Sequence, residues 1–304
     1  MTCQVLRLAA LALCALLAAC GSGTPPPDNL PAAASKRIER DGYAYDVGPA
    51  PVWVETAQIP PQWDADAPGA RDARWRTWLL DKQTDRRGAA RTRYSDIAFE
   101  PVSAELVGEA GKYTIGFNPE YQRLTIHAVE LRRDGAWSNR LDTGRITLAR
   151  RESDFEDDMA TGVVSALIVL DDVRAGDVVR MRYTIDGENP VLGGSDSEVA
   201  TFAWSDPILE RRLRVLFDRG ADVFEWRSDK IAPAQVERAS DRQDWKYVEK
   251  NIDGMHDEGG YPRWYSPYAQ VRLAERRSWA DVATWARSLY PEPQALPPDL
   301  EQRL

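Results

Sequence analysis

Residues 163–187 read VVSALIVLDDVRAGDVVRMRYTIDG and predict two β-strands joined by a turn. The first eight residues, 163–170, are almost continuously apolar, which is typical of a central strand buried on both faces. After the turn at 173–177, Val179, Met181, Tyr183 and Ile185 alternate with polar residues, as in a strand with one buried face. Asp186-Gly187 is a second turn signal. Strands that follow each other through regular turns, with no helix between them, indicate a β-sandwich.

The same pattern extends outward over residues 91–227. The apolar alternation that begins at Leu124 slips by one residue, so we expect a β-bulge near Ala128. Asp134-Gly135 is a favoured hairpin turn. Short strands separated by regular turns predict an all-β fold, a β-sandwich over residues 41–250. Upstream, the apolar and proline-marked segment 49–54 is expected to be an edge strand or an extended lead-in. Residues 73–80 fit a helix or a strand equally well.

The region after residue 250 differs in composition. A loop rich in Gly, Pro and aromatic residues spans 253–268, and Ser278 with Asp281 three residues later is typical of a helix N-cap. Prolines from Pro291 onward end the predicted helix. We therefore expect residues 251–304 to form a loop and a short helical extension of the sandwich.

The first 20 residues resemble the leader of a bacterial lipoprotein. The apolar run Leu8–Ala19 has about a dozen residues, well below the ~20 that a membrane-spanning helix needs. It ends in Leu-Ala-Ala-Cys, which resembles a lipobox. The resemblance implies that residues 1–19 are a signal peptide and that Cys20 carries the lipid, with palmitate among its acyl chains. The alternative is an ordinary signal peptide cleaved near Ala18 or Ala19.

Residues 20–40 are rich in Pro, Ala and Gly, so we expect a tether without regular structure. Gly21 and Ser22 follow Cys20, so the aspartate that often marks inner-membrane retention in bacterial lipoproteins is not there. By resemblance we expect a protein that the lipid on Cys20 anchors to the membrane of the bacterial envelope, facing the periplasm, with the outer membrane favoured.

The composition argues against several kinds of site. All three cysteines (Cys3, Cys14 and Cys20) lie within the first 20 residues, so the acylated mature chain has no free thiol, internal disulfide or cysteine for zinc. Lys and Arg number 39 against 48 Asp and Glu, a net charge of −9, so nucleic-acid binding is not expected. We expect no cofactor.

Five strings in order resemble the DUF3857 family, a domain of unknown function found in exported bacterial proteins. They are NPEYQRL at 118–124, LARRE at 148–152, DVRAGDVV at 172–179, ENPVLGG at 188–194 and SWADVATW at 278–285. Each string is weak alone, but five in order across residues 45–290 are fairly specific. The motif positions, for which we expect a structural role, are Tyr121, Gln122, Arg174, Gly176, Asp177, Asn189, Pro190 and Gly193.

The resemblance implies a β-sandwich module that precedes a transglutaminase-like domain, where the thiolate of a Cys-His-Asp core attacks an amide carbonyl. This sequence departs from that pattern, because no cysteine follows Cys20 and no histidine follows His256. We therefore expect a non-catalytic chain in which the helix after Ser278 is the start of a missing catalytic domain. A truncated product is favoured over a free-standing module.

Two histidines and two acidic runs are the remaining candidates for a metal or catalytic site. His127 is predicted on the solvent-facing side of a strand, and His256 lies in a loop with nearby carboxylates. The acidic runs, 154–158 and Asp171-Asp172, lack the spaced oxygen ligands and the glycine of an EF-hand loop. We therefore expect no metal site.

The leading functional hypothesis is a lipid-anchored, non-catalytic module that orients a transglutaminase-like enzyme or binds its protein substrate. The alternative is an independent module of the cell envelope that binds a glycan or a protein, with some of the 11 tryptophans as a sugar-binding platform. An enzyme in its own right would need carboxylates or a metal, and no constellation in the sequence supports one.

Overall fold

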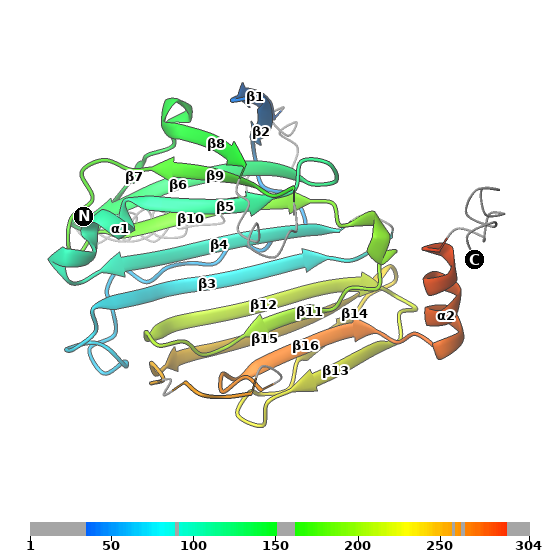
Figure 1. Cartoon of the computed structure of the whole chain (residues 1–304). Helices are drawn as coiled ribbons and strands as arrows, with labels where there is room; N and C mark the ends of the chain where they lie inside the picture. The colour runs from blue at the N-terminus through cyan, green and yellow to red at the C-terminus, as the bar shows by residue number, and fades with distance from the viewer. Residues whose placement is uncertain (1–34, 89–90, 151–161, 257–258, 263–264, 291–304) are drawn as a thin grey trace, which may run out of the picture. The chain divides into compact units, whose positions relative to one another are not determined.

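The computed structural model describes residues 35–88, 91–150, 162–256, 259–262 and 265–290 (Figure 1). The expected signal peptide, Cys20 and most of the expected tether lie outside the described residues, as do the acidic run at 154–158 and the residues after 290. The described chain is predominantly β-structure with one short helix near the C-terminus, as the sequence predicted.

The largest of three sheets has ten strands. Nine follow the order β1-β2-β6-β10-β4-β3-β12-β15-β14, and β7 pairs with β6. Neighbours are antiparallel except for the parallel pairs β2 with β6 and β3 with β12. The strands are β1 (Lys36–Arg40), β2 (Tyr43–Val47), β3 (Trp75–Asp85), β4 (Thr92–Pro101), β6 (Arg123–Arg133), β7 (Ala136–Asn139), β10 (Val178–Asp186), β12 (Ile208–Asp218), β14 (Gln235–Arg238) and β15 (Arg242–Ile252).

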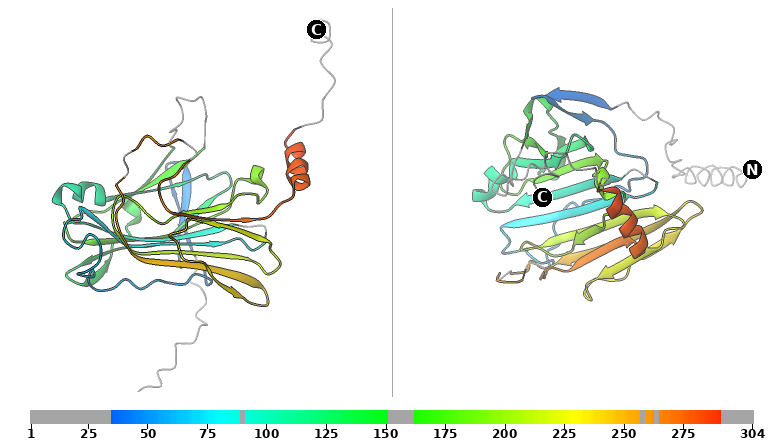
Figure 2. Two further views of the ribbon diagram at one scale, coloured as in Figure 1. Left: turned by 90° about the horizontal axis from the view of Figure 1, so that it is seen from below. Right: turned by 45° about the vertical axis from the view of Figure 1, so that its right-hand side comes forward.

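Two three-stranded sheets cover one face of the large sheet (Figures 1 and 2). The first sheet has the order β5-β9-β8, and the second has the order β11-β16-β13. Strand register places Met181, Ile97, Leu80 and Arg211 in one row across β10, β4, β3 and β12, so these side chains share a face. The strands are β5 (Lys112–Phe117), β8 (Ile146–Arg150), β9 (Val164–Val169), β11 (Glu198–Thr201), β13 (Val223–Arg227) and β16 (Gln270–Glu275).

Each small sheet makes its own core with the large sheet. Met181 packs with Ala166 and Ile168 of the first small sheet. Leu213 and Val215, which point to the same face as Arg211, pack with Val271 and Leu273 of the second. The expected sandwich is therefore present, with one layer split into two sheets.

The opposite face of the large sheet is covered by residues 49–63, which we name the strap. Ala57 of the strap is buried and packs with Trp78 and Leu79 of β3. Of the two alternatives for 49–54, the edge strand is wrong, because these residues form turns and irregular chain that leads into the rest of the strap. Pro49 and Pro51 lack the N–H groups that a strand would contribute to a ladder.

The predicted bulge in β6 is confirmed. Arg182 pairs with Ala128 and Tyr183 with Ile126, which makes His127 the extra residue. The expectation that His127 faces solvent is wrong, because its ring is half-buried and stacks on Tyr94. The ring nitrogens lie 2.8 Å from the carbonyl oxygen of Gly48 and 2.6 Å from the hydroxyl of Thr184. Burial lowers the pKa of His127.

Strand β9 is the central strand of the first small sheet, but only one of its faces is fully buried. Val164, Ala166 and Ile168 face the core, whereas the alternate residues, including Leu167, are half-buried. The expected burial on both faces is wrong because β9 belongs to an outer layer of the sandwich. Its apolar residues on the second face keep partial contact with solvent.

Both predicted boundaries of the sandwich shift. Residues 36–40, expected at the end of the tether, form β1 and pair with β2. Strand β16, within the region 251–304 expected to be loop and helix, completes the second core with Val271 and Leu273. The undecided segment at 73–80 lies mainly in β3.

The described helices are short, and the longest is α2 (Trp279–Ser288). The Ser278 hydroxyl accepts a bond from Asp281 N–H and the Asp281 carboxylate accepts one from Ser278 N–H, which confirms the predicted N-cap. No helix among the described residues is both long enough and apolar enough to cross a membrane. The other helices are η1 (Ala104–Leu106), α1 (Val107–Ala110), η2 (Thr143–Arg145) and η4 (Pro190–Leu192).

Candidate functional site

Two of the family strings meet at the end of β10. Gly187 follows β10 with φ of 103°, and a Cβ there would lie 2.0 Å from the carbonyl oxygen of Tyr121. Only glycine fits this approach, so the turn at 118–122 rests directly against the segment that leads into ENPVLGG. In that turn the Gln122 side chain accepts a bond from Asn118 N–H at 2.8 Å. The carbonyl of Tyr121 and the side chain of Gln122 thus both take part in this turn.

The ENPVLGG string forms a compact turn around η4. The Asn189 side-chain oxygen accepts a bond from Val191 N–H at 3.0 Å, and Pro190 begins the helix. Gly193 ends it in the left-handed region with φ of 52°. This turn leaves the carbonyl groups of Val191 and Gly193 accessible to another segment.

That segment is α2. The Trp285 indole N–H donates to the Val191 carbonyl at 2.7 Å, and Arg277, just before the helix, donates to the Gly193 carbonyl at 2.9 Å. A Cβ on Gly193 would lie 3.7 Å from the Trp285 ring, so turn and ring are in close contact. The last family string, SWADVATW, is thus bound to the string ENPVLGG, and we call this contact the helix junction.

Two buried arginines hold the ENPVLGG turn of the helix junction in place. Arg91 donates to the carbonyl groups of Arg86 at 2.7 Å and Gly194 at 3.1 Å. Its guanidinium also lies 3.3 Å from the Glu188 carboxylate. Arg86 pairs with Asp196 at 3.0 Å. The turn is therefore held on a network of paired charges next to β4.

The third family string closes the opposite end of β10. Asp177 is buried and accepts two bonds from Arg133, at 2.9 and 2.7 Å, and one from Arg174 N–H at 2.7 Å. The side chain of Arg174 pairs with Asp172 at 3.0 Å, and Gly176 has φ of 87°. The nine residues of β10 separate this turn from the helix junction by roughly 30 Å, so the motif positions form two groups.

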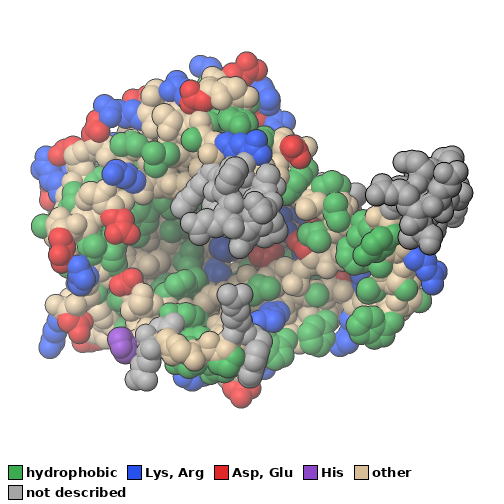
Figure 3. Space-filling view, in the orientation of Figure 1, with side chains coloured by type: hydrophobic (Ala, Val, Ile, Leu, Met, Phe, Trp, Pro, Cys, Tyr) green, Lys and Arg blue, Asp and Glu red, His purple; other side chains and the backbone are tan. Residues whose placement is uncertain are grey.

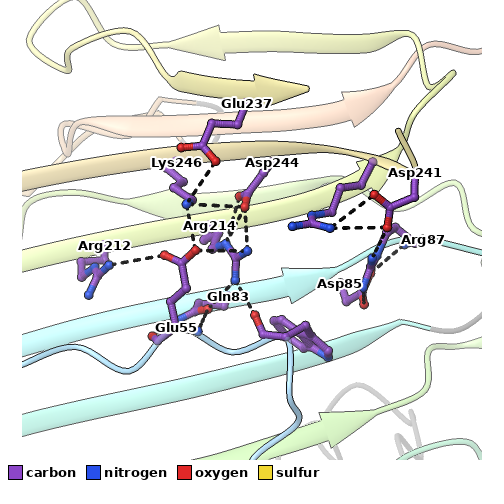
Figure 4. A network of polar contacts seen from close by, with 12 residues as sticks. Glu55, Gln83, Asp85, Arg87, Arg212, Arg214, Glu237, Asp241, Asp244 and Lys246 are labelled. Atoms are coloured by element: carbon purple, nitrogen blue, oxygen red, sulfur yellow. Dashed lines mark hydrogen bonds and ion pairs between the residues drawn. The ribbon is translucent and has the colours of Figure 1, made fainter. Parts of the chain in front are cut away.

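A second charged network joins the strap to the large sheet (Figure 4). Arg214 of β12 binds Asp244 of β15 through two nitrogens, at 2.9 and 2.6 Å, and donates to the Trp53 carbonyl of the strap at 2.5 Å. Lys246 lies 2.8 Å from Glu55. Arg180 of β10 likewise binds Asp96 and donates to the Ala57 carbonyl at 3.0 Å. Arginines of the large sheet thus hold the strap by donating hydrogen bonds to its main-chain carbonyl groups.

A hollow between the two small sheets has Lys and Arg atoms inside it (Figure 3). Between these sheets the large sheet continues through β4 and β3, where Lys82 lies on the same side as Thr84, whose hydroxyl bonds Glu198 of β11 at 3.0 Å. Although Lys82 is exposed, the surrounding protein limits the hydration of its ammonium group, and this lowers its pKa. The nearby positive charge of Arg211 lowers the pKa further.

No metal site was expected, and none of the described residues form a group of three or more His, Cys, Asp or Glu that could hold a metal. His256 is described, but the carboxylates that follow it in sequence, at 257 and 258, lie outside the described residues. Asp172 of the second acidic run is held by Arg133 and Arg174, and these bonds lower its pKa.

The residues of this candidate site that sequence reasoning missed are Arg86, Arg91, Trp285 as a hydrogen-bond donor, and Arg277. The tryptophan lay within a family string, but its donor role depends on a turn about ninety residues away in sequence. The arginines stand among other charged residues, and no local pattern distinguishes them.

A family comparison and solved structures place this arrangement among known proteins. The sequence profile of the Domain of Unknown Function DUF3857 matches residues 89–254, which is more than half of the chain. A candidate protease from Parabacteroides distasonis has a similar structure, with a TM-score of 0.59 and 13% identity. The match covers 67% of this chain and 40% of that protein, so this chain spans less than half its length.

Two other structures have lower similarity. An M1 zinc metallopeptidase from Deinococcus radiodurans has a TM-score of 0.34 and 9% identity, with 67% of this chain and 43% of that one covered. A candidate nutrient-binding protein from Legionella pneumophila has a TM-score of 0.32 and 9% identity, with 76% and 85% covered. No curated protein sequence matches. The profile match over residues 89–254, together with the all-β fold, shows that the chain belongs to the DUF3857 family.

Proposed function

We propose that the sandwich is a non-catalytic module of an envelope lipoprotein and that it orients a transglutaminase-like domain through α2. The observation that carries this proposal is the helix junction. Trp285 and Arg277 donate hydrogen bonds to main-chain carbonyl groups of the ENPVLGG turn. The strings SWADVATW and ENPVLGG, neither of which has another assigned role, are therefore in direct contact. A contact of this kind sets the direction in which the chain leaves the sandwich.

The helix is suited to carrying a further domain. Only three residues, 276–278, separate β16 from α2, so the helix cannot swing far from the second core. None of its residues is buried, and Trp279 is 87% exposed beside the junction. Tyr290, just past the helix, is 78% exposed. Large exposed apolar side chains on an anchored helix favour contact with another folded surface.

The membrane attachment in this proposal rests on the sequence. The lipobox-like residues before Cys20 favour acylation, and the residues from Gly21 to Ser35 would reach roughly 45 Å in a polyproline-like conformation. The described residues begin at Ser35, directly before β1, which is an edge strand of the large sheet. The fold shared with part of a larger candidate protease supports the idea of a module, at the level of the fold alone.

The orienting role can be tested by measuring distances between spin labels. A form that begins at Gly21 keeps every described residue and has no cysteine, so labels attach only at Arg238→Cys on β14 and Arg287→Cys on α2. We expect one narrow distance distribution, which Trp285→Ala broadens and the exposed control Trp279→Ala leaves narrow. A broad distribution without the Trp285 substitution would contradict a fixed helix.

Two further experiments test the remaining parts of the proposal. The coding sequence after the Leu304 codon, read in all frames, should encode a Cys-His-Asp core; a sequence without one removes the link to a thiol enzyme.

Mass spectrometry of the membrane-bound protein should find acyl chains on Cys20, and Cys20→Ala should release the protein or leave it uncleaved. A variant that stays lipidated would exclude Cys20 as the attachment site.

A further inference from the structure

The second small sheet has two edges, and they differ in how their main-chain groups are satisfied. Its order is β11-β16-β13, so β11 and β13 each pair on one side only. Unpaired N–H and C=O groups at a sheet edge are a template for another extended chain unless something covers them. Which groups point outward follows from the hydrogen bonds at the ends of the ladders.

For β13, the bonds from Arg276 N–H to Asp222 C=O at 2.8 Å and from Ser228 N–H to Gln270 C=O at 2.9 Å identify two hydrogen-bonded pairs. In an antiparallel ladder such pairs recur at every second residue. Residues 222, 224, 226 and 228 therefore point their main-chain groups at β16. The groups of Val223, Glu225 and Arg227 point away from it.

One outward group of β11 is satisfied by a side chain from the large sheet. Phe202 N–H bonds to Ala269 C=O at 2.7 Å, so the neighbouring Thr201 points its groups outward. The Thr201 carbonyl accepts a bond from the guanidinium of Arg211 at 2.9 Å. For β13, no hydrogen bond within the described part of the chain reaches the outward groups of residues 223, 225 and 227.

The outer face of β13 has two aromatic rings, each with an arginine over it. Arg276 lies 5.0 Å from the Phe224 ring centre and Arg272 lies 5.3 Å from the Trp226 ring centre. Glu225 points beneath the sheet, where it accepts a bond from the Tyr247 hydroxyl at 2.8 Å and lies 3.4 Å from Arg227. Phe224 and Trp226 are on the other face and are 40% and 46% exposed. They line a groove of about 410 Å³ together with Tyr265, Gln270 and Arg272. Figure 3 shows apolar side chains on the side of the molecule where Figure 1 draws β13 and β16.

We propose that β13 binds an extended peptide, which pairs with its free edge as a fourth strand and places alternate apolar side chains beside the groove. Outward N–H and C=O groups at every second residue are the pattern that another extended main chain satisfies. A saccharide could stack on Trp226 but would leave those groups unpaired. The groove then contributes the preference for apolar residues at alternate positions.

The probe for this proposal is the peptide acetyl-Asp-Thr-Val-Thr-Val-Thr-Asp-amide, with terminal aspartates for solubility. Titration of the form that begins at Gly21 should give saturable binding by calorimetry and shift the amide signals of residues 223–227. Only alternate residues of a paired peptide point their N–H at β13. N-methylation of one alternate set should therefore abolish binding, while N-methylation of the other set preserves it.

Protein variants locate the contact. Glu225→Pro removes an outward N–H without breaking the ladder to β16, since proline is tolerated at a sheet edge. Glu225→Gln is the matched control, because it keeps the N–H while changing the same side chain. We expect Glu225→Pro to bind at least about tenfold more weakly than Glu225→Gln. Equal affinities would overturn the proposal, as would the lack of saturable binding at millimolar peptide.

The groove is tested by Trp226→Ala, with Trp137→Ala as control, because Trp137 is also exposed and stacked by an arginine but lies on β7. Only Trp226→Ala should weaken binding. The alternative outcome is that an oligosaccharide of N-acetylglucosamine binds in place of the peptide. If Trp226→Ala then weakens oligosaccharide binding and Glu225→Pro does not, strand pairing is excluded. Trp285→Ala should bind the peptide normally, so this proposal can fail or hold independently of the orienting role of α2.

Discussion

The strap and the helix junction both use side chains that donate to main-chain carbonyl groups, but they do so in opposite surroundings. At the strap, Arg214 is nearly buried and its charge is matched by Asp244, with side chains 9% and 4% exposed. At the junction, Arg277 is exposed and no residue of α2 is buried. The first contact is part of the sandwich, whereas the second holds an element against it from outside.

This difference separates stability from orientation. A paired charge that loses its partner inside the protein costs far more than an exposed hydrogen bond, because the remaining charge cannot recover its hydration. The strap should therefore report on global unfolding and the junction on the local position of α2. The predictions below use that separation, in order of decreasing expected effect on the free energy of unfolding.

The largest effect is expected for Asp244→Ala. It removes the carboxylate that binds the buried Arg214 through two nitrogens and leaves only the more exposed Glu55, 3.3 Å away, so urea unfolding should show a loss of up to about 3–5 kcal/mol. The double variant Arg214→Met/Asp244→Ala, which also removes the poorly compensated charge, should lose less. A loss of unfolding free energy below about 1 kcal/mol would mean that this pair contributes no more than an exposed salt bridge. The strap and the helix junction would then not differ in their effect on stability.

Asp81→Asn should raise stability in a pH-dependent way. Burial raises the pKa of Asp81 from its usual 3.8 to about 6, although the hydrogen bond from Gln83 acts in the opposite direction. A carboxyl group with a raised pKa in the folded state favours folding while protonated, and this contribution is lost as the pH rises from 3.8 through 6.

The variant should therefore equal the wild type near pH 4 and exceed it by about 2–3 kcal/mol at pH 8. Urea unfolding at several pH values measures this difference. The exposed control Asp222→Asn should show no comparable gain. A gain independent of pH would mean that the carboxyl group of Asp81 does not titrate in the folded protein in this range.

Trp285→Ala should cost less than about 1 kcal/mol in global unfolding, as expected for one hydrogen bond at an exposed contact. Its effect should appear in α2, where the amide hydrogens of residues 283–288 should exchange faster with solvent. Amides of β12 should exchange as before. If Trp285→Ala destabilises the protein as much as Asp244→Ala, the junction belongs to the core and the contrast is wrong.

The smallest effect is expected for Arg277→Ala. This exposed side chain makes one bond at the junction, to the Gly193 carbonyl, so the change in unfolding free energy should be within about 0.5 kcal/mol. Hydrogen exchange in the first turn of α2 should increase slightly. Exchange that exceeds the effect of Trp285→Ala would show that Arg277, and not the indole, is the main anchor.

Part of this structure followed from local sequence, because alternation and turn chemistry act over a few residues. The two strands within residues 163–187, the slip in β6, the Asp134-Gly135 turn and the cap at Ser278 depend only on neighbours along the chain. That β9 and β10 lie in different sheets of the sandwich did not follow from the sequence. The ordered strings likewise identified the DUF3857 family, which a profile over residues 89–254 confirms. The lipid on Cys20 remains a prediction of this kind.

Only the tertiary structure decided how distant segments meet. Main-chain carbonyl groups are the same in every residue, so nothing in the sequence indicated that Trp285 would donate to Val191 or Arg214 to Trp53. Burial also depends on which layers stack, and local sequence does not show this. The expectations that β9 is covered on both faces and that His127 faces solvent were therefore wrong. The division of eight motif positions into two ends of β10 arises from the length of that strand and not from the residues themselves.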